Sequence, residues 1–209
     1  MSLAKDFPNV RVFGIGVDVT DAEAISEAVQ TVVKTLGSID HLSCFAGIVG
    51  CHHAMEMTDV QWRKTLDVNT TGSFLCARAV AKQIAAQKTG GGSITLTASI
   101  SGHRVNFPQP QVAYNVSKAA VIALKSSLAA EWAVHGIRVN SISPGYMDTI
   151  LNAGEGSIKE ARDSWASRNP MGRMGAVGEL DGMVVLLASR AGSYINGADM
   201  VVDGGAVVF

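Results

Sequence analysis

A tyrosine and a lysine four positions apart are the strongest chemical signal in this sequence. Tyr114 and Lys118 stand at the two ends of the segment YNVSK, and residues at positions i and i+4 share one face of a helix. An ammonium group beside a phenol favours the phenolate and lowers the tyrosine pKa from about 10 towards neutral pH. Tyr114 is therefore a candidate general acid or base. The pattern is short, and an ordinary helix with a surface lysine is the alternative.

Two further polar residues precede this pair in the chain. Ser99 ends a strand-like segment, and a loop containing Pro108 and Pro110 separates it from Tyr114. A serine in that place can donate a hydrogen bond to a carbonyl or alkoxide oxygen, as oxyanion stabilisers do. Asn69 lies within a helical stretch, where asparagine is a poor helix former, and so predicts a local break. A capping serine and a plain helix junction are the alternatives.

The segments that must position these residues alternate between strand and helix patterns. Strands are predicted over residues 10–18, 41–45, 93–99, 137–143 and 199–202, and helices over 21–36, 58–87 with a break, 112–135 and 180–187. Residues 150–175 are irregular and partly helical. Capping-box patterns at Thr20 with Glu23 and at Thr58 with Gln61 mark two of the helix starts. Strands that alternate with long helices predict a parallel sheet, with ligands beyond its carboxyl end.

Composition supports one α/β domain over residues 1–209. Hydrophobic residues make up 47% and charged residues 17% of the chain, which excludes a disordered protein and favours a buried sheet. The net charge of −1 gives no basic footprint for nucleic acid. No apolar run is long enough to span a membrane, and the first residues lack the apolar stretch of a signal peptide.

The three cysteines, Cys44, Cys51 and Cys76, lack a CxxC spacing, so reduced thiols in a cytoplasmic protein are expected. The segment Cys51-His52-His53 invites a metal hypothesis. Adjacent histidines point in different directions and no fourth ligand has a recognisable spacing, so we expect no metal site.

Taken in order, the chemical residues resemble the short-chain dehydrogenase/reductase family. The resemblance covers nearly the whole chain and is carried by Asp18-Val19, Ala46-Gly47, Asn69, Ser99-x-x-Gly102, Tyr114-x-x-x-Lys118, Pro144-Gly145-x-x-x-Thr149 and Asp203-Gly204-Gly205. The resemblance implies a Rossmann-like doubly wound parallel sheet. It also implies hydride transfer between NAD or NADP and an alcohol or ketone.

The resemblance further implies a role for each catalytic residue. Tyr114 would pass the proton and Ser99 would bind the carbonyl oxygen. Lys118 would lower the tyrosine pKa and bind the nicotinamide ribose, and Asn69 would bind a water in the proton relay.

The cofactor is expected to contact residues that follow the strands. Asp18 would accept from the adenine amino group, with the N–H of Val19 beside it. Ala46 and Gly47 would allow close approach of the cofactor. The Pro144-Gly145 pair, Thr149 and the backbone near Met147 would bind the carboxamide.

One subgroup of the family is most similar. Residues 99–114 and 143–149 are similar to fungal polyol and ketose reductases, which implies a small polyol or ketose as substrate. Ser101, His103, Asn106 and Gln109 would then supply polar groups for its hydroxyls; a solvated loop is the alternative. The family resemblance also implies a homodimer or homotetramer with the Tyr114 helix in one interface.

The sequence departs from the family pattern in two places. Cys44-Phe45-Ala46-Gly47 replaces the usual Asn-Asn-Ala-Gly or Asn-Ala-Gly, which affects local rigidity more than chemistry. The glycine-rich loop that cradles the pyrophosphate and the first two strands do not precede residue 10. Because those strands belong between strands 3 and 4 of the family, at about 4.8 Å each, the strand over 10–18 would lie roughly 14 Å from its nearest neighbour.

The second departure leaves three structural possibilities for the strand over 10–18 and two competing functions for the chain. The strand over 10–18 must pair with the strand over 41–45, borrow strands from another subunit, or leave the fold marginally stable. The chain is then either an NAD(P)-dependent oxidoreductase or a non-catalytic interaction protein that no longer binds the cofactor. A preference between NAD and NADP is not readable, because the discriminating residue normally follows strand 2.

Overall fold

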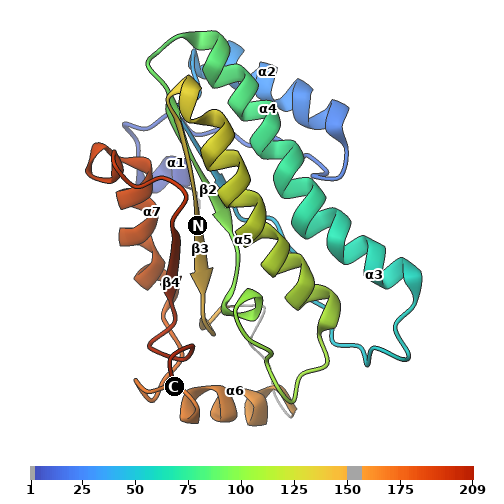
Figure 1. Ribbon diagram of the computed structural model, residues 1–209. Coiled ribbons are helices and arrows are strands. Elements are labelled where there is room, and N and C mark those ends of the chain that lie inside the picture. The colour runs from blue at the N-terminus through green and yellow to red at the C-terminus, as the bar shows by residue number, and fades with distance from the viewer. Residues whose placement is uncertain (1–2, 150–156) are drawn as a thin grey trace.

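The computed structural model describes residues 3–149 and 157–209, which form a four-stranded parallel sheet with helices on both faces (Figure 1). The strands lie in the order β1 (His41–Cys44), β2 (Gly92–Thr97), β3 (Ile137–Pro144) and β4 (Asp199–Val202). Helices α4 (Gly72–Gln87) and α5 (Val112–Trp132) cover one face, and α7 (Asp181–Ala188) packs on the other. The predicted Rossmann-like α/β class is confirmed.

The other helices are short or peripheral to the sheet. They are α1 (Leu3–Asp6), α2 (Ala22–Leu36), α3 (Asp59–Leu66) and α6 (Ser157–Ser167). The helix predicted over 112–135 is α5 followed by a 3₁₀ turn, Ala133–His135, and it ends at Gly136 in a left-handed conformation. Helix α6 falls in the segment predicted as irregular and partly helical.

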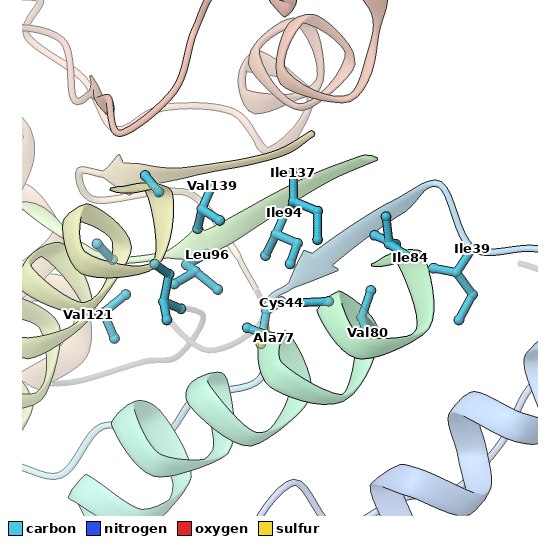
Figure 2. Close-up of a cluster of buried hydrophobic side chains, with 14 residues drawn as sticks. Ile39, Cys44, Ala77, Val80, Ile84, Ile94, Leu96, Val121, Ile137 and Val139 are labelled. Carbon is cyan, nitrogen blue, oxygen red and sulfur yellow. The ribbon is translucent and has the colours of Figure 1, made fainter. Parts of the chain in front are cut away.

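The core lies between β2, β3 and helices α4 and α5. Ile94 and Leu96 of β2 are completely buried and face Ala77 and Ile84 of α4 (Figure 2). Thr95, on the opposite face of the same strand, is 1% exposed. Strand β2 is therefore buried on both faces, as central parallel strands are, and its carboxyl end is a rigid support for the residues that follow.

The strand predicted over residues 10–18 does not form. These residues are without strand structure, and Val10, Val12, Phe13 and Ile15 are 38% to 58% exposed. Within the described residues β1 pairs with β2 and with no other strand, so re-pairing of 10–18 onto β1 is wrong as well. A strand pattern needs a neighbour that completes its backbone hydrogen bonds, and this segment has none.

One predicted helix start is wrong and the other is confirmed. Asp21, not Thr20, is the N-cap of α2: its carboxylate accepts from the backbone N–H of Glu23 and Ala24, while Thr20 donates its hydroxyl to Asp18. The capping box of Thr58 and Gln61 is present at the start of α3.

The break predicted around Asn69 is a π-helical turn. Residues Asp67–Thr71 form this wider turn between α3 and α4, with Asn69 buried at its centre. A π turn inserts one extra residue into the helix and often marks a functional position. Gly72 follows the turn, and a side chain there would lie 2.9 Å from Val19 Cγ2, so the segment after residue 18 packs directly against the start of α4.

Candidate active site

Tyr114 and Lys118 lie in the first turns of α5, at the carboxyl end of the sheet. The Lys118 Nζ is 5.6 Å from the centre of the Tyr114 ring, as the i and i+4 spacing predicts. It donates a 2.7 Å hydrogen bond to the carbonyl oxygen of Thr97, the last residue of β2. Lys118 is 4% exposed, so the helix and the central strand together enclose its ammonium group.

The pKa values of the two residues are shifted mainly by burial. Burial lowers the pKa of Lys118 to about 8, with nearby Cys44 opposing the shift. Burial raises the pKa of Tyr114, and a side-chain hydrogen bond with Ser99 partly offsets that rise. The net direction is opposite to the lowering expected from the sequence, because burial outweighs the groups that favour the phenolate. The phenol is therefore protonated at neutral pH. A protonated phenol is suited to donate a proton.

Ser99 follows β2 and caps the 3₁₀ turn Ile100–Gly102. Its Oγ accepts from the backbone N–H of Ser101 at 3.1 Å and lies 3.1 Å from the Ser101 hydroxyl. The Ser101 hydroxyl also accepts from the Gln111 amide at 3.4 Å. These contacts orient the Ser99 hydroxyl next to the phenol of Tyr114.

Gly102 allows the turn after Ser99 to lie against α5. A Cβ at residue 102 would lie 2.9 Å from the Ala119 nitrogen and 2.9 Å from the Lys118 carbonyl carbon. We expect Gly102→Ala to lower the free energy of unfolding by about 1–3 kcal/mol, and to lower kcat because Ser99 moves relative to Tyr114. Urea denaturation and steady-state kinetics measure the two effects.

The matched control for Gly102 is Gly182 in α7, where a Cβ would meet nothing within 4 Å. Gly182→Ala is expected to raise stability by up to about 1 kcal/mol, since alanine is the better helix former. Equal effects of the two substitutions would contradict the close approach at Gly102.

Asn69 connects the π turn with two other segments. Its Oδ1 accepts from the Ile48 N–H at 2.8 Å, and its Nδ2 donates to the Ile48 carbonyl and the Ser117 hydroxyl, each at 2.9 Å. Asn69 is 1% exposed. The amide therefore fixes the loop after β1 against α5, which is where the catalytic pair lies.

Asn69→Ala is expected to destabilise the protein by about 2–4 kcal/mol, because the partly buried N–H and C=O of Ile48 and the buried Ser117 hydroxyl lose their partner. Asn115→Ala is the control: its side chain accepts one hydrogen bond from Gln111 at the partly buried start of α5. Thermal unfolding compares the two variants. If Asn69→Ala is as stable as Asn115→Ala, the bridging role of Asn69 is wrong.

Gly47 lies where Asn69 and Lys118 meet. A Cβ there would be 3.3 Å from Asn69 Oδ1 and 3.5 Å from Lys118 Nζ, so a side chain would crowd both groups. Cys44, which ends β1, is buried beside them. A hydrogen bond with Cys76 lowers the pKa of the Cys44 thiol to about 7, with Ser73 and Lys118 contributing, and raises that of Cys76.

Asp18 and Val19 lie at the other side of the π turn. The Asp18 carboxylate accepts from Thr20 through both backbone and hydroxyl, at 2.9 and 2.7 Å, and these bonds lower its pKa. Asp18, Thr20 and Val68 line a surface hollow of about 370 Å³. A planar group bound there would lie beside the Asp18 carboxylate.

The residues after β3 pack closely on the turn after β4. Gly145 donates its N–H to Val202 at 3.0 Å, and a side chain at 145 would lie 2.8 Å from Asp203 Cβ. Met147 is buried and pairs with Gly175, and Thr149 donates its N–H to the Met147 carbonyl. The segment 144–149 thus lies beyond the carboxyl end of β3, against the turn after β4 and Gly175.

Comparison with known proteins decides which family this arrangement represents. A family model described as enoyl-(acyl carrier protein) reductase matches residues 1–207. The NADP-dependent mannitol dehydrogenase of Alternaria alternata is 41% identical over 199 residues, which are 95% of this chain and 73% of that protein. A crystal structure of a short-chain type dehydrogenase/reductase from Mycobacterium marinum superposes with a TM-score of 0.92 at 39% identity, covering 98% of this chain and 80% of that one. The chain belongs to the short-chain dehydrogenase/reductase family.

Two further relatives have names that specify a sugar alcohol or ketose. Galactitol 2-dehydrogenase (L-tagatose-forming) of Cereibacter sphaeroides is 40% identical over 192 residues, 92% of this chain and 74% of that protein. A sorbose reductase of Candida albicans is 38% identical over 191 residues, 90% of this chain and 66% of that protein. The chain is thus a member of an enzyme family of NAD(P)-dependent dehydrogenases and reductases.

The residues present fit the nicotinamide end of the family's cofactor. The Lys118 ammonium has three N–H donors, and among the described residues its hydrogen bond goes to Thr97 alone. Gly47 leaves open the space that borders this ammonium. Lys118 and Tyr114 would contact the ribose, and segment 144–149 the carboxamide.

The four residues predicted to contact substrate lie in three different places. Asn106 donates its amide to the Tyr146 hydroxyl at 2.9 Å, and Gln109 accepts from the same hydroxyl. Ser101 instead supports Ser99. His103 lies 2.7 Å from the Asp199 carboxylate of β4, so its Nε2 is directed to the sheet edge.

The sequence did not predict roles for Ser117 and Gln111. It indicated Trp165 as part of a substrate lid or as a packing residue, but did not predict that its ring stacks on Tyr146. Ser117 is completely buried, and its hydroxyl accepts a hydrogen bond from the Asn69 amide. Its position three residues after Tyr114, on the same side of the helix, could have marked it as part of the site. The Tyr146 and Trp165 rings stack with centroids 4.4 Å apart and planes at 6°. No local sequence signal joins two residues so far apart in the chain.

The part of the chain that the structure describes contains neither a metal-ligand cluster nor a membrane-spanning helix. Within it, no three or more His, Cys, Asp or Glu side chains are grouped to bind a metal ion. The loop with Cys51 runs along residues 110–111, where His52 donates its N–H to Pro110. Among the described helices, none has the length and apolarity needed to cross a bilayer.

Proposed function

We propose that the protein is an NADP- or NAD-dependent oxidoreductase that interconverts a secondary alcohol and a ketone, with a polyol or ketose as substrate. The observation that carries the proposal is the convergence of Ser99, Tyr114 and Lys118 at the carboxyl end of β2. The polyol assignment is supported by relatives named for mannitol, galactitol and sorbose.

The chain's own residues account for the proton transfer. When bound, the nicotinamide cofactor supplies the hydride in ketone reduction and accepts it in alcohol oxidation. Ser99 donates a hydrogen bond to the substrate oxygen, where negative charge develops. Tyr114 gives its proton to that oxygen in reduction, and in oxidation its phenolate takes the proton back.

Lys118 contributes through its charge. Because the ammonium lies 5.6 Å from the Tyr114 ring in a buried setting, it stabilises the phenolate left after proton donation. Burial disfavours the charged form of Lys118 and lowers its pKa to about 8. The rate of ketone reduction should therefore be highest below pH 8, where Lys118 is charged and Tyr114 is protonated.

Location and assembly belong to the same proposal. We expect a cytoplasmic protein, in line with the free cysteines of the described residues, and a homodimer or homotetramer. The alternative is a non-catalytic protein that does not bind the cofactor. Its motivation is the exposed segment 10–18, which pairs with no strand among the described residues and which the expected fold separates from β1 by two further strands.

The test uses the full 209-residue chain. Oxidation of NADPH and NADH is followed with D-fructose, L-sorbose and D-xylulose, and thermal unfolding is titrated with each cofactor. We expect turnover of at least one ketose, faster with NADPH because the relatives from Alternaria alternata and Hypocrea jecorina are named NADP-dependent. A cofactor at 100 times its Kd should stabilise the protein by about 2.7 kcal/mol. No stabilisation and no turnover would favour the non-catalytic alternative.

A further inference from the structure

A cavity of about 620 Å³ lies beside the catalytic residues rather than among them. Among the described residues its walls are the loop that follows the Ile100–Gly102 turn, Tyr146, helix α6 with Arg168, and residues Ala206 and Phe209. Helix α6 crosses beyond the carboxyl ends of the strands (Figure 1). The polar and aromatic residues that matter for binding are Arg104, Asn106, Gln109, Tyr146, Trp165 and Arg168.

Tyr146 connects this cavity to the active site. It follows Gly145 directly at the end of β3, and it stacks on Trp165 of α6. Its hydroxyl forms hydrogen bonds with Asn106 and Gln109, two of the four residues predicted to contact the substrate. The cavity therefore borders segment 144–149, which is expected to contact the nicotinamide and which contains Tyr146.

The cavity carries positive charge from two arginines. Among the described residues, Arg104 and Arg168 line it, no Asp or Glu side chain does, and neither arginine forms an ion pair with an acidic side chain. Arg168 donates to the carbonyl of Phe107 at 2.8 Å, and Arg104 donates at 3.4 Å to an oxygen of Phe209, the last residue of the sequence.

Each arginine has further N–H donors beyond these bonds, because a guanidinium carries five. Both arginines also act on Tyr146 in the cavity wall. Burial raises the pKa of its phenol, and the hydrogen bond with Asn106 and the charges of Arg104 and Arg168 oppose that rise. A neutral sugar alcohol has no anionic group to pair with the two arginines. An anionic group would pair with it through charge-assisted hydrogen bonds.

We propose that this cavity binds the anionic end of the substrate, so that the substrate is a polyol or ketose carrying a carboxylate or a phosphate. This inference rests on the proposed oxidoreductase function. The Tyr146 and Trp165 rings offer an apolar surface for the C–H face of a sugar chain, and the amides of Asn106 and Gln109 offer donors and acceptors for hydroxyl groups. Arg104 and Arg168 supply the charge.

The first experiment compares substrates. The native chain is assayed with NADPH and three ketoses: neutral D-fructose, the carboxylate 5-keto-D-gluconate and the phosphate ester D-fructose 6-phosphate. We expect kcat/KM for at least one anion to exceed that for fructose by at least about tenfold. The two anions distinguish a carboxylate from a phosphate. Equal kcat/KM for all three ketoses would overturn the proposal.

The second experiment removes the charge. Arg104→Gln and Arg168→Gln should each lower kcat/KM for the preferred anion by at least about tenfold, and lower that for fructose by a clearly smaller factor. Arg190→Gln is the matched control, because Arg190 lies in the short turn after α7 and lines a different cavity at the opposite end of the sheet. Equal losses for fructose and for the anion would contradict an anion site.

The third experiment measures binding without turnover. Thermal unfolding is followed with D-gluconate, D-glucitol 6-phosphate and neutral D-mannitol at matched ionic strength. We expect the Tm to rise with an anion and not with mannitol, and the rise to disappear when Arg104 and Arg168 are both glutamine. No rise with either anion would overturn the proposal. If the native chain reduces none of the ketoses, the oxidoreductase function fails, and this binding result alone decides the anion site.

Discussion

Tyr114→Phe is expected to lower kcat for ketone reduction by a factor of about 10² to 10⁴, the range of a lost general acid. Phenylalanine keeps the ring but has no proton to give to the substrate oxygen. The phenol's hydrogen bond with Ser99 is lost too, which changes the free energy of unfolding by only about 1 kcal/mol. Steady-state oxidation of NADPH by a ketose and urea denaturation measure the two effects.

Tyr194→Phe is the matched control for Tyr114, because Tyr194 is fully exposed at the opposite end of the sheet. That variant should match the native rate. The pH dependence gives a second readout: since burial raises the pKa of Tyr114, alcohol oxidation, which needs the phenolate, should accelerate as pH rises. A Tyr114→Phe variant that keeps more than about a tenth of the native kcat would show that another group donates the proton.

Lys118→Met is expected to abolish measurable turnover and yet to make the protein more stable at pH 7. The reason is that the ammonium is buried: its pKa falls from 10.5 to about 8 in the folded chain. At about 1.4 kcal/mol per pKa unit, the charge costs the folded state up to about 3 kcal/mol. Methionine removes that cost but also the bond to Thr97, so the net gain should be about 1–2 kcal/mol.

The dependence of this gain on pH is fixed by the direction of the shift. Below pH 8 the folded and unfolded chains both carry the Lys118 proton, and the cost of burying the charge is fully present. Between pH 8 and 10.5 the folded chain has released the proton and the unfolded chain still binds it, so native stability rises with pH. The advantage of Lys118→Met should therefore be largest below pH 8 and shrink above it.

Lys125→Met is the control for a buried lysine on the same helix. Lys125 is 5% exposed and donates to the Gly197 carbonyl at 2.7 Å, away from the catalytic residues. Its replacement should leave kcat unchanged. Urea denaturation from pH 6 to 10 compares the stability of the two variants. If Lys118→Met is less stable than the native protein at pH 7, interactions of the ammonium in the folded state outweigh the cost of burying its charge.

The local elements were predictable because their signals lie within a few residues. The alternation of strands and helices, the capping box at Thr58 and the break at Asn69 all depend on local backbone preferences. Residues 10–18 show the limit of this reasoning. Their alternating apolar pattern is that of a strand, but a strand also needs a neighbour, and neighbours are set by topology rather than by the segment itself.

The sequence by itself determined the chemistry of the catalytic set, since the residue types and the four-residue spacing of Tyr114 and Lys118 place phenol and ammonium on one helix face. Only the tertiary structure decided the pKa shifts of these residues and which side chains lie around them. Burial raises the pKa of Tyr114 and lowers that of Lys118, and burial is a property of the whole core. Arg104 and Arg168 are 64 positions apart and meet at one cavity because the loop after β2 and the end of α6 converge there.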